Sequence, residues 1–188
     1  MNNWLPDTLP PGLYGLALTT ALVAAYFDIR WRKIPNPLVL AALVMGLVGN
    51  IWLRGLPGLA LGLGGLLLAA AIYFPLYLLK GMGAGDVKLM AALGAIVGPR
   101  QWLLLFVFAA LFGALAGVLL ASAKGKLKIT LLNTGLLFQE LAAFRVPHRN
   151  HDQLQLHHPD AIRMPHGVAI AVGTVVFVLV MVFGRVGR

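Results

Sequence analysis

The chain lacks cysteine altogether and carries little charge. None of its 188 residues is cysteine, which excludes disulfides, thiolate metal sites and cysteine nucleophiles. Only 11% of the residues are charged, whereas soluble domains carry about 25%. Because 60% of the residues are hydrophobic and no polar stretch is long enough to bury a core, we predict an integral membrane protein without a separate soluble domain.

Basic residues are missing from the start of the chain, where the first Lys or Arg is Arg30. A secretory signal peptide has a basic region before its apolar run, so we expect no cleaved signal. A net charge of +9 would indicate nucleic-acid binding in a soluble protein. In a membrane protein, basic residues instead set the orientation and meet anionic lipid, so we expect lipid partners and no nucleic acid.

Six apolar segments predict an all-α protein with about six transmembrane helices. A span needs about 20 residues, and the first and fourth segments are short by this measure. We assign the whole chain, residues 1–188, to one membrane-embedded domain. The segments cover about residues 13–27, 38–53, 57–79, 86–98, 102–122 and 167–184.

The Lys and Arg residues divide unevenly between the two sides of such a fold. Most lie in the first, third and fifth connections, and the remainder are Arg54, Arg100, Arg185 and Arg188. The positive-inside rule therefore predicts that these three connections are cytoplasmic and that both termini are outside. The asymmetry depends largely on the last connection, over residues 123–165, which is basic and then His-rich.

Two of only 6 acidic residues lie at the edge of the membrane or inside it. Asp28 ends the first apolar segment and Asp86 opens the fourth. A charged Asp at the centre of a membrane helix costs about 2.5–3.5 kcal/mol, so such residues are functional candidates by default. Two carboxylates at similar depth predict a single site with acid–base chemistry on water.

The residues around the two aspartates are candidates for shaping this site. After the first aspartate, Pro35 ends a helix and Asn36 suits the N-cap of the next one. Before the second, Gly83 and Gly85 provide a backbone that another group can approach closely. Lys88 lies on a different helical face from that aspartate, and a Lys in such a place usually extends to the membrane interface.

Phe27-Asp28 through Ile34-Pro35-Asn36, together with Gly83-Ala84-Gly85-Asp86-Val87-Lys88-Leu89, closely resembles the type IV prepilin peptidases. These are intramembrane aspartyl proteases of the Gly-x-Gly-Asp class. Pro165-His166-Gly167-Val168-Ala169-Ile170-Ala171 resembles the last span of the family, although His166 stands where an aromatic residue is expected. The resemblance implies that Asp28 and Asp86 are catalytic and that no metal or cofactor takes part.

The chain resembles the short form of that family. Longer relatives carry a cytoplasmic insert with paired Cys-x-x-Cys motifs before the first Asp motif, and they also N-methylate the new terminus. Here the first span runs directly into Asp28 and the chain has 0 cysteines. The chain is therefore similar to the compact type that serves tight-adherence (Flp) pili, and the resemblance implies a leader peptidase without N-methyltransferase activity.

The substrate implied by the resemblance is a prepilin or pseudopilin, with a short basic leader, a Gly before the cut and then an apolar helix. The cut lies at the cytoplasmic face of the bacterial inner membrane. One carboxylate acts as general base on a water, and the other, protonated, polarises the scissile carbonyl. The sequence does not indicate an oligomeric state.

The last connection carries a cluster of histidines, namely His148, His151, His157 and His158. Because their spacing is irregular and their neighbours are polar, we interpret residues 123–165 as a solvated linker that rests on the membrane or helps to capture substrate. A metal site is the alternative. Within this connection, the stretch from Leu131 to Phe144 is compatible with an interfacial amphipathic helix.

Two other function classes fit part of the pattern. Paired intramembrane aspartates also serve proton-coupled transporters, although these usually show repeated halves, which this chain does not. A pilus-assembly scaffold without catalysis is the third class. Cleavage of a prepilin by the purified protein would separate all three.

Overall fold

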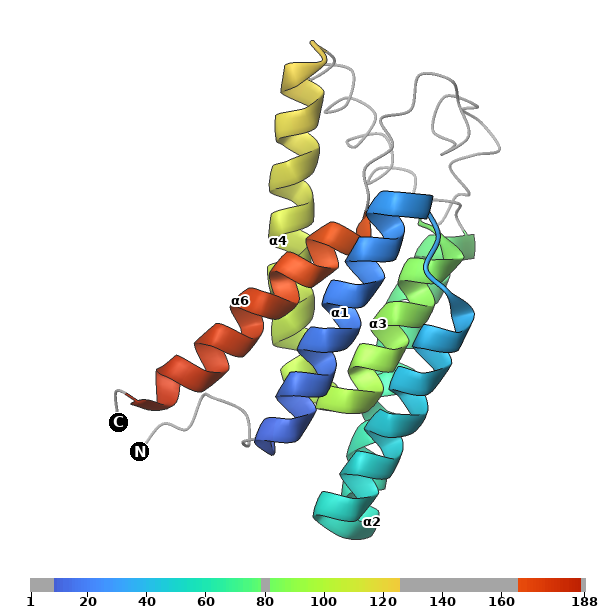
Figure 1. Ribbon diagram of the computed structural model, residues 1–188, viewed down its shortest axis with the longest axis vertical. Coiled ribbons are helices and arrows are strands. Elements are labelled where there is room, and N and C mark those ends of the chain that lie inside the picture. The colour runs from blue at the N-terminus through green and yellow to red at the C-terminus, as the bar shows by residue number, and fades with distance from the viewer. Residues whose placement is uncertain (1–8, 79–81, 126–165, 187–188) are drawn as a thin grey trace.

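The computed structural model describes residues 9–78, 82–125 and 166–186, and these residues form helices and no β-strand. The prediction of an all-α protein is confirmed for this part of the chain. The loop histidines and the expected interfacial helix fall outside the described residues. The five described helices are α1 (Pro11–Trp31), α2 (Asn36–Leu78), α3 (Ala84–Val97), α4 (Pro99–Ala123) and α6 (His166–Val186) (Figure 1).

Four of the described helices, α1, α2, α4 and α6, are long and apolar enough to cross a membrane. Helix α3, with 14 residues, is shorter than the usual minimum of about 17 for a span. Each of the six predicted apolar segments falls largely within a described helix, as expected of a multi-pass membrane protein. The number of crossings stays a prediction.

Helix α2 consists of two halves that reverse direction at Gly55. Its 43 residues would extend about 64 Å at 1.5 Å per residue, roughly twice the hydrocarbon thickness of a bilayer. Gly55 has a φ of 66° and a ψ of −153°, which is not helical. Beyond it, Gly58 lies directly against the backbone of Asn50, so the second half returns along the first (Figure 1).

Helix α3 packs into the angle between the two halves of α2 and forms the centre of the core. Gly94 of α3 lies directly against the backbone of Gly65 in the second half. Gly46 in the first half lies against Ile96. Glycine permits this close approach because it has no Cβ, and the approach buries most of α3.

The end of α3 is held by a buried side chain of α2. The amide nitrogen of Asn50 donates hydrogen bonds to the carbonyls of Gly46 (3.0 Å), Ala95 (3.0 Å) and Ile96 (2.9 Å). The last carbonyls of a helix have no partner within that helix, so Asn50 caps α3 from outside. This cap fixes α3 at the end opposite to Asp86.

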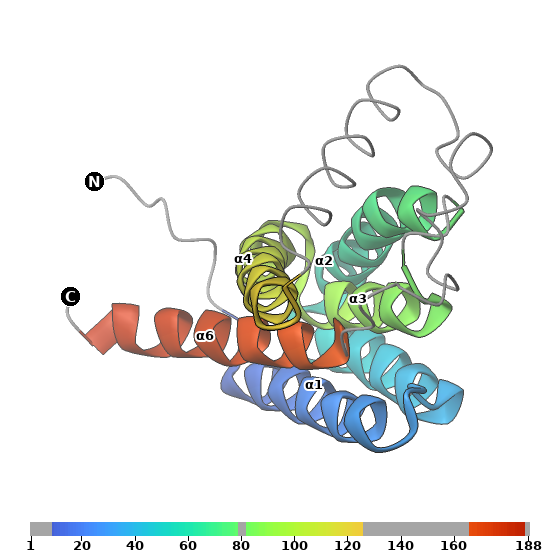
Figure 2. The same cartoon turned by 90° about the horizontal axis from the view of Figure 1, so that it is seen from above.

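The helix ends that carry the predicted motifs gather at one end of the molecule. The last turn of α1 and the first turns of α2, α3 and α6 lie there, whereas α1 begins and α6 ends at the other end (Figures 1 and 2). Helix α6 lies between α1 and α4 (Figure 2). This arrangement places residues from distant parts of the sequence within reach of one another.

Candidate active site

Asp28 lies in the last turn of α1, where the helix ends. Arg32 adopts a left-handed conformation with a φ of 53°, and its N–H donates a hydrogen bond of 2.9 Å to the carbonyl of Asp28. Such a residue commonly closes the C-terminus of a helix. The carboxylate of Asp28 is half-buried at this end of the bundle.

Asp86 lies in the first turn of α3 and is also half-buried. Its backbone N–H donates a hydrogen bond of 3.2 Å to the carbonyl of Gly83, which precedes the helix. A Cβ on Gly83 would lie 3.1 Å from Oδ2 of Asp86, tighter than ordinary van der Waals contact. Gly83 therefore leaves room for the carboxylate, and the N-terminus of the helix favours its negative charge.

Pro35 and Asn36 begin α2 at the same end of the molecule. The carbonyl of Pro35 accepts a hydrogen bond of 3.3 Å from the N–H of Val39 in the first turn. Asn36 was expected to cap this helix and is its first residue. Its side-chain oxygen accepts a hydrogen bond of 3.0 Å from Nζ of Lys88, so the two sequence motifs are joined directly.

Gly85 provides a second connection between the motifs. A Cβ at this position would lie 3.3 Å from Cβ of Ile34, so the glycine lets the start of α3 pack closely on the connection between α1 and α2. Lys88 is exposed, as a side chain at the membrane interface would be. The five residues predicted to shape the site therefore lie around the aspartates, and their roles stay predictions.

The structure brings the two aspartates into one electrostatic environment. Asp86 of α3 interacts electrostatically with Asp28 of α1, although the residues belong to different helices. This proximity is what a single site with two carboxylates requires.

The start of α6 contacts Asp28 and interacts electrostatically with Asp86, and sequence reasoning assigned its residues no role. The N–H of Gly167 donates a hydrogen bond of 2.9 Å to Oδ2 of Asp28. A Cβ on Gly167 would lie 3.0 Å from the same carboxylate, so glycine leaves room for this contact. His166, which precedes it, interacts electrostatically with Asp86. The sequence signal for these contacts was the stretch from Pro165 to Ala171, which contains the His-Gly pair that opens the last apolar segment.

Tyr73 is a further residue that sequence reasoning missed. It lies in the second half of α2, is buried and interacts electrostatically with Asp86. Its ring packs against two aromatic rings of α4. The ring centroid of Tyr73 lies 6.0 Å from that of Trp102 and 5.8 Å from that of Phe106. A tyrosine inside an apolar segment was the available signal, because a buried hydroxyl usually needs a polar partner.

The described residues contain no group of three or more His, Cys, Asp or Glu side chains placed to hold a metal ion. The alternative of a metal site concerned His148, His151, His157 and His158, which fall outside the described part. The chemistry available to the described site is therefore that of two carboxylates, an imidazole, a phenol and a backbone N–H.

The fold and the two aspartates place the protein in a class, namely helical membrane proteins with a candidate acid–base site at one end of the helix bundle. The sequence model of the Type IV leader peptidase family matches residues 15–118, which is more than half of the chain and includes both aspartates. The chain belongs to this family.

Several relatives are prepilin leader peptidase/N-methyltransferases. The chain is 34% identical over 126 residues to that of Xanthomonas campestris pv. campestris, covering 63% of this chain and 44% of the relative. It is 34% identical over 121 residues to that of Neisseria gonorrhoeae, covering 61% and 42%. For Bacillus subtilis the identity is 33% over 107 residues, covering 53% and 41%. The matches thus span less than half the length of these relatives, and no solved structure matches the chain.

Proposed function

We propose that the protein is an intramembrane aspartyl endopeptidase that removes the leader peptide of type IV prepilins, with Asp28 and Asp86 as the catalytic pair. The observation that carries the proposal is the electrostatic interaction between these two carboxylates, which come from α1 and α3 and lie at the same end of the bundle. Membership of the Type IV leader peptidase family supports it, as do relatives that are named prepilin leader peptidases.

The mechanism follows from the chemistry of two neighbouring carboxylates. Such groups do not easily ionise together, so the proposed mechanism uses one carboxylate ionised and the other protonated. The ionised carboxylate removes a proton from a water, which attacks the scissile carbonyl. The protonated carboxylic acid polarises that carbonyl and then donates its proton to the leaving amine. In this scheme the N–H of Gly167 holds the carboxylate of Asp28 in a fixed orientation.

The same proposal places the site at the cytoplasmic face of the bacterial inner membrane, with both termini outside and residues 1–188 in one domain. Its support is the distribution of basic residues in the described part of the chain. Arg30, Arg32, Lys33 and Lys88 lie at the end that holds the aspartates. The positive-inside rule assigns such an end to the cytoplasm.

We further propose peptidase activity without methyl transfer. The support is the resemblance to the short form of the family and the absence of cysteine from the 188 residues. The relatives combine both activities in their names.

The test is cleavage of a prepilin by purified protein in the presence of a labelled methyl donor, with the products weighed by mass spectrometry. We expect wild-type protein to release the mature pilin without an added methyl group. Asp28→Asn and Asp86→Asn should each reduce cleavage by at least about 1,000-fold, because neither carboxylate replaces the other in acid–base catalysis.

The matched control is Asp7→Asn, which makes the same chemical change at an acidic residue outside the pair. It should cleave at the wild-type rate, and all variants should insert and elute from gel filtration as wild type does. Near wild-type cleavage by either variant of the pair would contradict the catalytic assignment. A methylated mature product would contradict the proposal of peptidase activity alone.

A further inference from the structure

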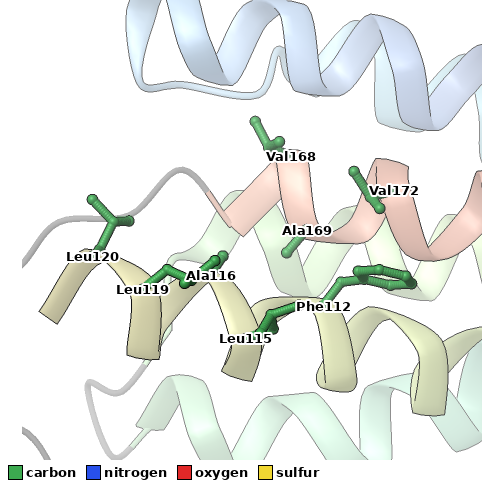
Figure 3. Close-up of a pocket in the computed structure, with 8 residues that line it drawn as sticks. All are labelled: Phe112, Leu115, Ala116, Leu119, Leu120, Val168, Ala169 and Val172. Carbon is green, nitrogen blue, oxygen red and sulfur yellow. The ribbon is translucent and has the colours of Figure 1, made fainter. Parts of the chain in front are cut away.

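A hollow of about 290 Å³ lies between α4 and α6 (Figure 3). All of its lining side chains are Phe, Leu, Val or Ala, from Phe112 to Leu120 on α4 and from Val168 to Val172 on α6. In Figure 3, Ala169 points from α6 toward α4. The volume is close to the lower limit of about 300 Å³ for ligand pockets, so it suits one face of a helix better than a compact ligand. We call this hollow the α4–α6 groove.

The α6 side of the α4–α6 groove begins next to the candidate active site. Val168, which lines the groove, directly follows Gly167, the residue whose N–H binds the carboxylate of Asp28. Val168 also packs against the cluster of Ala21, Ala25 and Ala171, which joins α6 to α1. A chain held in the groove would therefore lie close to the start of α6, where Gly167 binds Asp28.

The groove opens away from the core. Leu115 and Leu119 on its α4 side are 54% and 61% exposed. Only 11% of the most apolar stretch of α4 is buried, against 44% for α1 and for α6. Helix α4 is long and apolar enough to cross a membrane, where this opening would face lipid and an apolar segment could enter sideways.

Shape, and not apolarity alone, makes the groove a place for a helix. Lipid tails are as apolar as Leu, so helices associate in a bilayer through close packing at small residues. Ala116 and Ala169 line the groove, and a Cβ on the neighbouring Gly117 would meet nothing within 4 Å. The lining stretch of α4 from Phe112 to Leu120 has a length of about 12 Å, or roughly two helical turns.

A second hollow in the described residues does not share these properties. It has a volume of about 310 Å³ and is lined by residues that include Arg54, Arg100 and Gln101. It lies where α3 meets α4, at the end of α3 opposite to Asp86. A substrate held there would be distant from both aspartates.

We propose that the α4–α6 groove binds the first two turns of the substrate's apolar helix, on the mature side of the bond to be cut. This inference rests on the proposed function, in which that bond lies at the aspartate pair. The basic leader finds no polar or acidic group in the groove, whereas the apolar helix must continue from the pair into the bilayer. The groove offers that helix an apolar surface starting beside Gly167.

The absence of cysteine allows a direct test by disulfide cross-linking. Leu119→Cys introduces a thiol in the groove, and Val118→Cys introduces one at the same depth on a face that does not line it. The native side chains are 61% and 45% exposed, so both thiols are accessible. With a prepilin carrying one cysteine about one helical turn beyond the cut, we expect cross-linking to Leu119→Cys and not to Val118→Cys. Equal cross-linking of both, or cross-linking of neither, would show that the substrate helix does not bind in the groove, and would overturn the proposal.

A kinetic test separates failure of this inference from failure of the proposed function. Ala116→Trp should fill the groove and raise KM for full-length prepilin by at least about tenfold with little change in kcat, because binding and not chemistry is lost. Val118→Trp is the control and should behave as wild type. If Ala116→Trp also behaves as wild type, the groove is not the binding surface. If wild type and Val118→Trp both fail to cleave, the proposed function is wrong, and the groove assignment falls with it.

Discussion

Helices α3 and α4 follow one another across Gly98 and yet have opposite surroundings. Gly94 of α3 is followed four residues later by Gly98, and Gly113 of α4 is followed at the same spacing by Gly117. Gly94 lies directly against the backbone of α2, whereas a Cβ on Gly117 would meet nothing within 4 Å. The same spacing therefore packs Gly94 tightly into the core and leaves Gly117 beside open space.

The difference matches what the two helices carry. Helix α3 holds Asp86, and the proposed mechanism requires its position relative to Asp28 to be accurate. Helix α4 carries one wall of the α4–α6 groove, which in our proposal needs room for the substrate helix. We therefore expect substitutions in α3 to act on folding and on the site, and substitutions on the exposed face of α4 to act on binding or on nothing measurable.

The largest difference between the two helices should appear in the yield of folded protein when valine replaces one glycine of each pair, Gly94 in α3 and Gly117 in α4. Gly94→Val drives a branched side chain into the backbone of Gly65, which cannot move without separating α3 from α2. Overpacking of a core typically lowers the free energy of unfolding by about 1–3 kcal/mol. We expect the clash of the new side chain with backbone atoms to cost as much as the upper end of this range or more. We expect a large loss of folded protein after membrane extraction, measured by gel filtration and thermal denaturation in detergent.

Gly117→Val is the matched control and should give the wild-type yield and melting temperature. If both variants fold equally well, the contrast between the two helices is not real. If Gly117→Val folds but cleaves prepilin with a raised KM, the open space beside α4 belongs to the groove.

A smaller effect should follow from removing the cap at the end of α3. Asn50→Ala leaves the carbonyls of Ala95 and Ile96 without their donor in a buried place. An unsatisfied buried polar group costs about 1–3 kcal/mol, so the melting temperature should fall while the folded protein still cleaves. Thr19→Val is the control, because it removes an exposed hydrogen bond to Gly15 on α1. If the melting temperature falls no further for Asn50→Ala than for this control, the cap does not fix α3.

The smallest effect on cleavage is expected from a substitution in α6. The first residues of this helix lie at the candidate site, and the residues that follow line the groove. His166→Phe introduces the aromatic residue that the family resemblance leads one to expect. It removes an imidazole that, when protonated, stabilises the negative charge of Asp86. Asp28 and Tyr73 remain as the other titratable groups facing Asp86.

Because His166 interacts electrostatically with Asp86, its replacement should alter the pH–rate profile for cleavage. KM at the pH optimum should stay within about twofold, because the groove is unchanged. An unchanged pH profile would show that His166 does not act on the aspartate pair.

The sequence by itself determined the membrane class, the apolar segments, the two aspartates and the family. These properties are local, because a run of apolar residues needs a bilayer and a carboxylate within it has a large cost wherever the chain later folds. The ends of α1 and α3 also follow from local signals, since a proline and a glycine-rich stretch interrupt the helices there. Asp28 and Asp86 could therefore be named from the sequence.

Only the tertiary structure decided which residues surround that pair. Gly167, His166 and Tyr73 reach the aspartates from α6 and α2, and no spacing along the chain predicts contacts between helices so far apart in sequence. The tertiary structure also decided which glycines pack against another helix. A glycine permits close approach, but the sequence around it does not say which helix will be its neighbour. The α4–α6 groove exists for the same reason, since its shape depends on how two helices cross and not on either sequence alone.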